Sequence, residues 1–192
     1  MGLSDDVAAF DHCLDPTLWI VTASDGTAIG GLLATFVKPA SIVRELPRMV
    51  VGIARQHKTW ELIESTGAFA LHVLRAEHAA WATTFGLTSS RTTDKFASLR
   101  HLKGRTGSPI LTESSGWLDC RVEDRLDTGD RTLYLAEILD ARPPAAGPAL
   151  TVNGWLQLLD DGRRELLRQQ IAEDATIDAE LIRAWRRRRE DC

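Results

Sequence analysis

The sequence predicts a mainly β protein with some α structure: an antiparallel, Greek-key-like barrel with inserted short helices and a helical extension at the C-terminus. Six or seven short apolar runs are joined mostly by short turns, which is typical of a closed or nearly closed antiparallel barrel. Residues 143–148, PPAAGP, mark the end of the barrel. Beyond them, apolar residues recur at helical spacing. We therefore expect a barrel domain over residues 1–148 and a helical extension over residues 149–192.

The composition is that of an ordinary globular protein. Of 192 residues, 44% are hydrophobic and 26% are charged, so the chain can form a sizeable core. The net charge of −4 argues against nucleic-acid binding. No apolar run approaches the ~20 residues that cross a bilayer, and the N-terminus lacks the basic and apolar segments of a signal peptide. We therefore expect a cytoplasmic protein that binds neither nucleic acid nor membrane.

The cysteines do not predict a disulfide framework. There are three, Cys13, Cys120 and Cys192, and they lie far apart in the sequence. An odd number at such spacing suits a reducing compartment, and none belongs to a CxxC pair. The spacing of zinc ligands is absent as well, so we expect no metal site.

The first predicted elements are a helix over residues 5–12, capped by Ser4, and a hairpin. Residues 18–23 form its first strand and residues 28–37 its return strand, with Asp25-Gly26 at the turn. Glycines are costly inside a strand, so Gly30-Gly31 indicates a bulge, a bend of the barrel or the close approach of a ligand. The sequence leaves these three readings open.

The following elements alternate between strands and short helices. We expect strands over residues 48–54, 68–74, 118–122 and 132–139, with a turn at 127–130. A helix over 59–65 would have Thr59 as its N-cap and end at Gly67. Further helical segments are expected over 77–85, 95–99, 155–159, 162–173 and 177–189, with loops at 86–93 and 102–108.

A series of short motifs runs along residues 10–140. They read VTASDG at 21–26, GG at 30–31, ATF at 34–36, Ser41, Pro47, GAFALHVL at 67–74, FG at 85–86, DKF at 94–96, PIL at 109–111 and LDC at 118–120. In order and spacing they resemble the flavin reductase-like family, the FMN-binding split β-barrels. That family often has two prolines after its serine, whereas this chain has only Pro47. The loop that wraps the cofactor is therefore expected to differ.

This resemblance implies an FMN site. Carried over position by position, the cofactor-binding candidates are Ala34, Thr35, Phe36, Ala40, Ser41, His57, Lys58 and Thr59, with Lys95 and Phe96 matching the family's lysine/arginine–phenylalanine pair.

The residues themselves give partial support for this site. Lys58 and Thr59 combine a cation, a hydroxyl and free amides at the start of a predicted helix, and His57 adds a further donor, a combination that suits a phosphate. Equally, Thr59 can be only a helix cap and Lys58 only a solvated charge. Thr35 and Ser41 can likewise have purely structural roles instead of binding a ligand: Thr35 as a residue that favours strands and Ser41 as a turn residue.

The function implied by the resemblance is an FMN-binding oxidoreductase that passes a hydride from NADH or NADPH to flavin. The sequence contains no catalytic triad, paired-carboxylate signature or G-x-G-x-x-G fingerprint, so the nicotinamide would bind over the flavin. We expect a homodimer, with a partner oxygenase or another electron acceptor. The alternatives are an FMN-binding electron carrier or sensor without NAD(P)H turnover, and an interaction protein that has lost the pocket.

Overall fold

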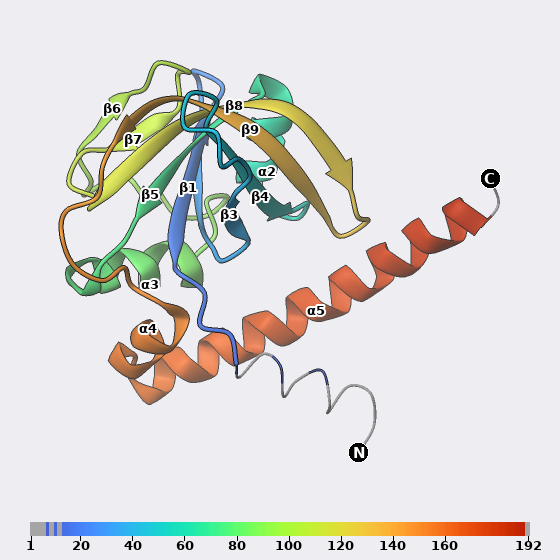
Figure 1. Cartoon of the computed structure of the whole chain (residues 1–192). Helices are drawn as coiled ribbons and strands as arrows, with labels where there is room; N and C mark the ends of the chain where they lie inside the picture. Colours follow the sequence, from blue (N-terminus) through green and yellow to red (C-terminus); the bar gives the residue numbers. More distant parts are fainter. Residues whose placement is uncertain (1–6, 8–9, 11–12, 191–192) are drawn as a thin grey trace.

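The computed structural model describes residues 7, 10 and 13–190, and its main feature is a strongly curved antiparallel sheet (Figure 1). The sheet has seven strands in the order β2-β1-β5-β8-β9-β4-β3, and β6 and β7 form a small second sheet. The strands are β1 Trp19–Ser24, β2 Ile29–Ala34, β3 Val37–Pro39, β4 Arg48–Ala54, β5 Ala68–Val73, β6 His101–Lys103, β7 Pro109–Leu111, β8 Gly116–Asp127 and β9 Arg131–Arg142. The helices are α2 Lys58–Thr66, the 3₁₀ turn η1 Ala76–His78, α3 Ala79–Leu87, α4 Val152–Leu158 and α5 Asp161–Glu190.

The junction between β2 and β3 brings the two edges of the sheet together. These strands stand at opposite ends of the strand order, yet only Thr35 and Phe36 separate them in the sequence. The Gly52 amide of β4 donates to the Phe36 carbonyl at 2.8 Å, which fixes the junction against the far edge. The predicted antiparallel barrel is confirmed. The single return strand expected over 28–37 was wrong, because the chain changes sheet edge at this junction.

The predicted hairpin turn is confirmed. Asp25 Oδ1 accepts hydrogen bonds from the Thr27 and Ala28 amides, at 2.9 and 2.8 Å, and Gly26 has a φ of 90°. These bonds hold the pKa of the Asp25 carboxyl at about 2, below its usual value. A residue with a side chain rarely adopts this φ, so the glycine is what allows the turn.

Gly30 and Gly31 are explained by packing inside the protein. The β1–β2 register is continuous from the Trp19–Ala34 pair to the Ser24–Ile29 pair, so of the three readings a bulge is absent here. A Cβ on Gly30 would lie 2.9 Å from Leu62 Cδ1, and one on Gly31 would lie 2.5 Å from Phe85 Cε1. The close approach is therefore made by side chains of α2 and α3.

Two apolar clusters form the core, one on each face of β1. Val21 and Ala23 point into the barrel, whereas Leu18 and Ile20 belong to a second cluster with α3 and α4. Leu150, Trp155 and Leu159 are buried in the second cluster. The segment directly after the proline-rich stretch is therefore part of the core.

The C-terminal helical prediction is confirmed in type but not in number. One 30-residue helix, α5, replaces the two helices expected over 162–173 and 177–189. Residues 174–176, Asp-Ala-Thr, contain no glycine or proline, so nothing in the backbone stops the helix there. In Figure 1, α5 runs below the barrel and its C-terminal part extends past it.

Other element boundaries differ locally from the prediction. The N-cap of α2 is His57, and Thr59 is the second helical residue with a buried side chain, so the predicted Thr59 cap was wrong. Gly67 ends α2 as expected, with a φ of 64°. The loop expected over 102–108 contains part of β6, and α3 continues two residues beyond Phe85. The helix predicted over 5–12 lies outside the described residues, apart from Val7 and Phe10.

Candidate functional site

An apolar cavity of about 460 Å³ lies at the end of the barrel where β2 passes into β3. Ala34, Thr35 and Phe36 form one side of it, and Ile53 and Ala54 at the end of β4 form another. Aliphatic and aromatic side chains from β2, α4, α5 and the residue before β1 complete the lining: Leu18, Leu32, Leu33, Val152, Trp155, Leu167 and Ile171. A slot of this size and lining suits a flat apolar ring.

A second cavity of about 390 Å³ continues from the first and is much more polar. His57, Gln56 and Gly86 line both, so the two spaces meet at this point. The second cavity adds the cations Lys58 and Arg91, and hydroxyls from the turn after α3: Thr88, Ser89 and Ser90. A third cavity of about 420 Å³ shares Lys58, Ser90 and Arg91 with it. Together they make a groove that is apolar at one end and cationic at the other.

The start of α2 supplies hydrogen-bond donors to the polar end. His57 is its N-cap and makes no side-chain cap hydrogen bond. The first amides of a helix have no intrahelical acceptor, so those of Lys58 and Thr59 are available to a ligand. With the helix dipole and the Lys58 ammonium, they favour an anion at this place.

His57 lies where the apolar and polar cavities meet. Burial lowers the pKa of its imidazole, and the positive charges of Lys95, Arg131 and Arg91 lower it too, while Asp174 acts in the opposite direction. The imidazole is therefore neutral at pH 7, and it can both donate and accept a hydrogen bond there.

Lys95 joins two elements of the site instead of presenting its charge to solvent. Its Nζ donates to the carbonyls of Gly31 and Phe85 at 3.0 and 3.1 Å, and the side chain is buried. Burial lowers the pKa of its ammonium to about 8. Ser90 also bonds the backbone of Gly31. These contacts tie the end of α3 and the following turn to β2, beside the second cavity.

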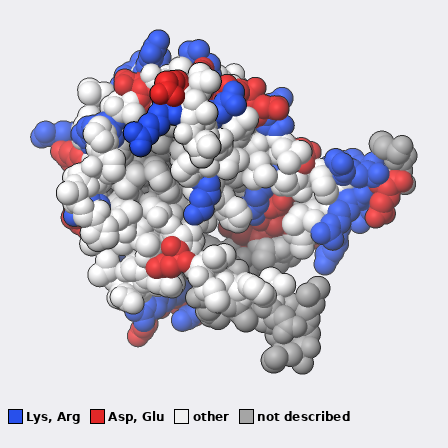
Figure 2. Space-filling model, in the orientation of Figure 1, with Lys and Arg blue, Asp and Glu red and all other residues white. Residues whose placement is uncertain are grey.

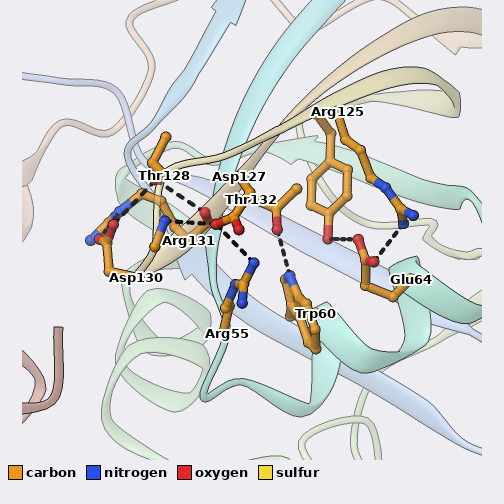
Figure 3. Close-up of polar contacts among 11 residues, drawn as sticks. Arg55, Trp60, Glu64, Arg125, Asp127, Thr128, Asp130, Arg131 and Thr132 are labelled. Atoms are coloured by element: carbon orange, nitrogen blue, oxygen red, sulfur yellow. Dashed lines mark hydrogen bonds and ion pairs between the residues drawn. The ribbon is translucent and has the colours of Figure 1, made fainter. Parts of the chain in front are cut away.

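A network of charged side chains borders the apolar cavity at the start of β9 (Figure 3). The guanidinium of Arg131 pairs with Asp130 at 2.5 Å and with Asp178 of α5 at 3.0 Å. It also lies 4.6 Å above the centre of the Phe36 ring. Arg131 thus connects the β2–β3 junction, the β8–β9 hairpin and α5.

Asp174 and Asp178 bring negative charge from α5 to the same place. Asp174 accepts a hydrogen bond from the Gln56 amide at 3.2 Å. Burial raises the pKa of Asp178, the Asp130 and Asp174 carboxylates raise it further, and Arg131 opposes them. Figure 2 shows acidic side chains beside a hollow between the body and α5, and basic side chains at the far end of the helix.

The structure brings most of the predicted site residues together. Ala34, Thr35, Phe36 and His57 line the apolar cavity, and His57, Lys58, Thr59 and Lys95 line the polar one. Phe96 reaches only the third cavity, and its buried ring packs edge-on against Phe85 with centroids 5.5 Å apart.

Ala40 and Ser41 lie apart from the residues that line these three cavities. They stand in the connection between β3 and β4, where Ser41 Oγ accepts a hydrogen bond from the Val43 amide at 3.0 Å. Their role in binding stays a prediction.

Sequence reasoning missed several residues of the groove. Arg91 and Ser90 lie in a stretch that was predicted only as a loop, and Arg131 adjoins a predicted turn. The hydroxyl-rich run TSSRTT at 88–93 was an available signal, because serine, threonine and arginine suit a phosphate. The α5 side chains had no such signal, since only the tertiary fold places them here.

Two kinds of feature are absent from the described part of the chain. No three His, Cys, Asp or Glu side chains there are grouped to hold a metal ion. None of the described helices is both long enough and apolar enough to cross a membrane.

Comparison with known proteins identifies the family. The model of the flavin reductase like domain matches residues 12–159. The chain is 34% identical over 130 residues to HsaB of Rhodococcus jostii, the reductase subunit of a flavin-dependent monooxygenase, covering 65% of this chain and 64% of HsaB. It is 27% identical over 126 residues to diflavin flavoprotein A 1 of Synechocystis, covering 65% of this chain but 22% of that protein. The chain thus spans less than two thirds of these relatives.

The fold also agrees with a solved structure. An FMN-binding protein from Thermus thermophilus superposes with a TM-score of 0.67 at 19% identity, over 76% of this chain and 85% of that one. At this identity the match bears on the fold alone. The family model covers most of the chain, and the split-barrel fold and motif order agree with it. The chain belongs to the family of the flavin reductase like domain.

Proposed function

We propose that this protein is an FMN-binding oxidoreductase that passes a hydride from NADH or NADPH to flavin. One observation carries the proposal: a single groove runs from an apolar slot to the cationic start of α2. The three parts of FMN need three environments, and the groove offers them in the right order: an apolar slot for the ring, hydroxyls for the ribityl chain, and cations with free amides for the phosphate. The family of the chain supports the same assignment.

In this proposal each part of the groove has a separate task. Ala34, Thr35 and Phe36 border the ring, and the guanidinium of Arg131, which also lines the cavity, holds the Phe36 ring in place. Lys58, Thr59 and Arg91 bind the phosphate, with the first amides of α2. Bound flavin supplies the redox chemistry, so the protein binds, orients and excludes water.

An electron carrier or sensor that binds FMN without turning over NAD(P)H is the second candidate. One observation favours it: α5 borders the apolar cavity through Leu167, Ile171 and Ala175, and so restricts the space in which a nicotinamide could lie over the ring. Bleaching of the flavin band by NADH or NADPH supports the reductase, whereas a stable band with either donor supports the carrier.

The partners belong to the proposal as well. HsaB is a reductase subunit, so reduced flavin made here would serve a partner oxygenase or another acceptor. A homodimer is supported by apolar side chains exposed on the loop between β3 and β4, among them Ile42 and Leu46. Light scattering on the purified chain gives its mass in solution, and a monomer at working concentration contradicts the dimer.

The first test is the visible spectrum of the purified protein with added FMN, followed by titration of Lys58→Glu. Reversing this charge beside the phosphate should weaken FMN binding at least about tenfold, or about 1.4 kcal/mol. Riboflavin has the same ring without the phosphate, so its affinity should not change. Lys103→Glu, on β6 away from the groove, is the matched control. A wild-type protein that binds no flavin overturns the proposed function.

A further inference from the structure

Helix α5 lies outside the matched family region, which ends at residue 159, yet it forms part of both cavities. Seven of its half-buried residues recur every three or four positions along one stripe: Arg164, Leu167, Gln170, Asp174, Asp178, Leu181 and Trp185. Residues at this spacing share one face of a helix, so α5 lies lengthwise along the barrel. Five residues of α5 line the apolar cavity: Leu167, Asp174 and Asp178 from this stripe, and the exposed Ile171 and Ala175 beside it.

Polar contacts hold α5 along the rim of the groove. Gln170 Nε2 donates to the Leu87 carbonyl at 3.2 Å, where α3 ends. Gln56 Nε2 donates to Asp174 and Arg131 to Asp178, on the opposite rim. Farther along, Trp185 lies against Gly129 at the tip of the β8–β9 hairpin, so closely that a Cβ on the glycine would lie 2.7 Å from it. The helix is thus fixed on both sides of the cavity.

Apolar surface of α5 remains uncovered in the cavity. Ile171 lines the cavity and still has 58% of its surface exposed. Leu167, one turn earlier, faces the same space. A flat ring bound there would cover both side chains and would be stabilised by the apolar area removed from water.

Two acceptor atoms beside this apolar surface lack a partner. Gln56 Oε1 and Asp178 Oδ1 are buried and have no hydrogen-bond partner among the residues that the structure describes. Both residues line the apolar cavity. Buried acceptors are nearly always satisfied, because leaving one unpaired costs free energy. A ligand with an N–H group on its edge would supply the missing donor.

We propose that α5 is a ligand-binding element of the groove: Leu167 and Ile171 contact the flavin ring, and Asp178 together with Gln56 accepts a hydrogen bond from the N–H on its edge. This inference rests on the proposed function. The flavin ring fits because it is flat and largely apolar and carries an N–H on its pyrimidine part. The helix therefore determines how tightly the ring binds, and the cations of α2 determine how tightly the phosphate binds.

The test uses the full chain, titrated with FMN and, separately, with riboflavin. Ile171→Trp places an indole in the slot, and it should weaken the binding of both flavins at least about tenfold. Leu166→Trp is the control: Leu166 is also exposed, lies five residues before Ile171 and is outside the cavity lining, so this variant should bind as the wild type does. Because Ile171 is exposed, the indole does not disturb the core, and an unchanged melting temperature confirms that the variant folds.

A second variant tests the acceptor. Asp178→Ala should weaken FMN and riboflavin equally, by about fivefold or more, while Glu180→Ala removes an exposed carboxylate from the same helix as a control. Lys58→Glu, in contrast, should affect FMN alone. If Ile171→Trp and Asp178→Ala bind both flavins with wild-type affinity, the role of α5 is overturned and the proposed function stands. If the wild type binds neither flavin, both proposals are overturned.

Discussion

The barrel and α5 differ in how they use their apolar side chains. In β1, the side chains of Ile20, Val21 and Ala23 are fully buried between the two core clusters. In α5, none of the 30 residues is buried, although the helix carries leucines, isoleucines and a tryptophan. Burial is the main source of folding stability, so the barrel should hold nearly all of it. Helix α5 is instead placed by one ion pair with the barrel, hydrogen bonds and partly covered side chains, and its apolar surface remains available to a ligand.

Two truncations should change the free energy of unfolding more than any other variant proposed here. They show where along the chain the stabilising core ends and α5 begins. A chain ending at residue 147 loses Leu150, Trp155 and Leu159, which are buried in the second core cluster. Its free energy of unfolding should fall by at least about 5 kcal/mol, since each large buried side chain contributes about 2–5 kcal/mol. A chain ending at residue 160 loses only α5 and should keep most of its stability.

Urea unfolding of both chains measures this difference. Equal unfolding midpoints for the two truncations would contradict this contrast. They would mean that residues 148–160 add no stability beyond what the loss of α5 already removes. The chain ending at residue 160 also tests the inference on the ligand, because it should fold and yet bind riboflavin more weakly than the full chain does.

Matched isoleucine substitutions test the same contrast one residue at a time. Ile53 in β4 is 1% exposed, whereas Ile177 in α5 is 44% exposed. Ile53→Ala should lower the free energy of unfolding by about 2–5 kcal/mol through the cavity that it leaves. Ile177→Ala should change it by less than about 0.5 kcal/mol. A loss above 2 kcal/mol for Ile177→Ala would show that α5 contributes to the core.

The pH dependence of stability should come from the barrel as well. His72 is fully buried, where Nδ1 donates to the Ile20 carbonyl and Nε2 accepts from the Leu111 amide. Burial lowers the pKa of this imidazole to about 4. Above pH 6.5 it is neutral whether the chain is folded or not. Between pH 6.5 and 4 only the unfolded chain takes up the proton, so the stability should fall by about 3 kcal/mol as the pH falls.

His72→Gln can make similar hydrogen bonds without titrating, so its unfolding curve should lose this pH-dependent part. The chain ending at residue 160 should keep it, because His72 lies far from the removed helix in the sequence and within the sheet. Identical pH profiles for the wild type and His72→Gln, measured between pH 4 and 7, would rule out His72 as the source.

Signals within a few residues were enough to predict much of the fold. Asp25-Gly26 predicted the first hairpin, Gly67 predicted the end of α2, and residues 48–54 were predicted as the strand that β4 forms. Such features depend on backbone preferences at single positions, which the sequence states directly. Three residues of the groove, His57, Lys58 and Thr59, were also predicted from local sequence, as a cluster of hydrogen-bond donors at the start of a helix.

Other features required distant residues to meet. Thr35 and Phe36 were predicted as the last part of a single strand over residues 28–37, because their local preference is extended, but closure of the barrel makes them the junction between its two edges. Gly30 and Gly31 left a bulge, a bend of the barrel and a ligand as open readings, and the side chains that need their space come from residues more than 30 positions later, such as Leu62 and Phe85. Propensity contains no information on such contacts.

The sequence by itself therefore determined the class of the protein: an antiparallel split barrel with the motif order of the flavin reductase like domain, and a helical C-terminal segment. Only the tertiary structure decided that this segment is one helix and that it borders the groove. The reason is that turns and caps are set by neighbouring residues. In contrast, the position of α5 depends on Gln56, Leu87 and Arg131, which lie at least 40 positions away in the sequence.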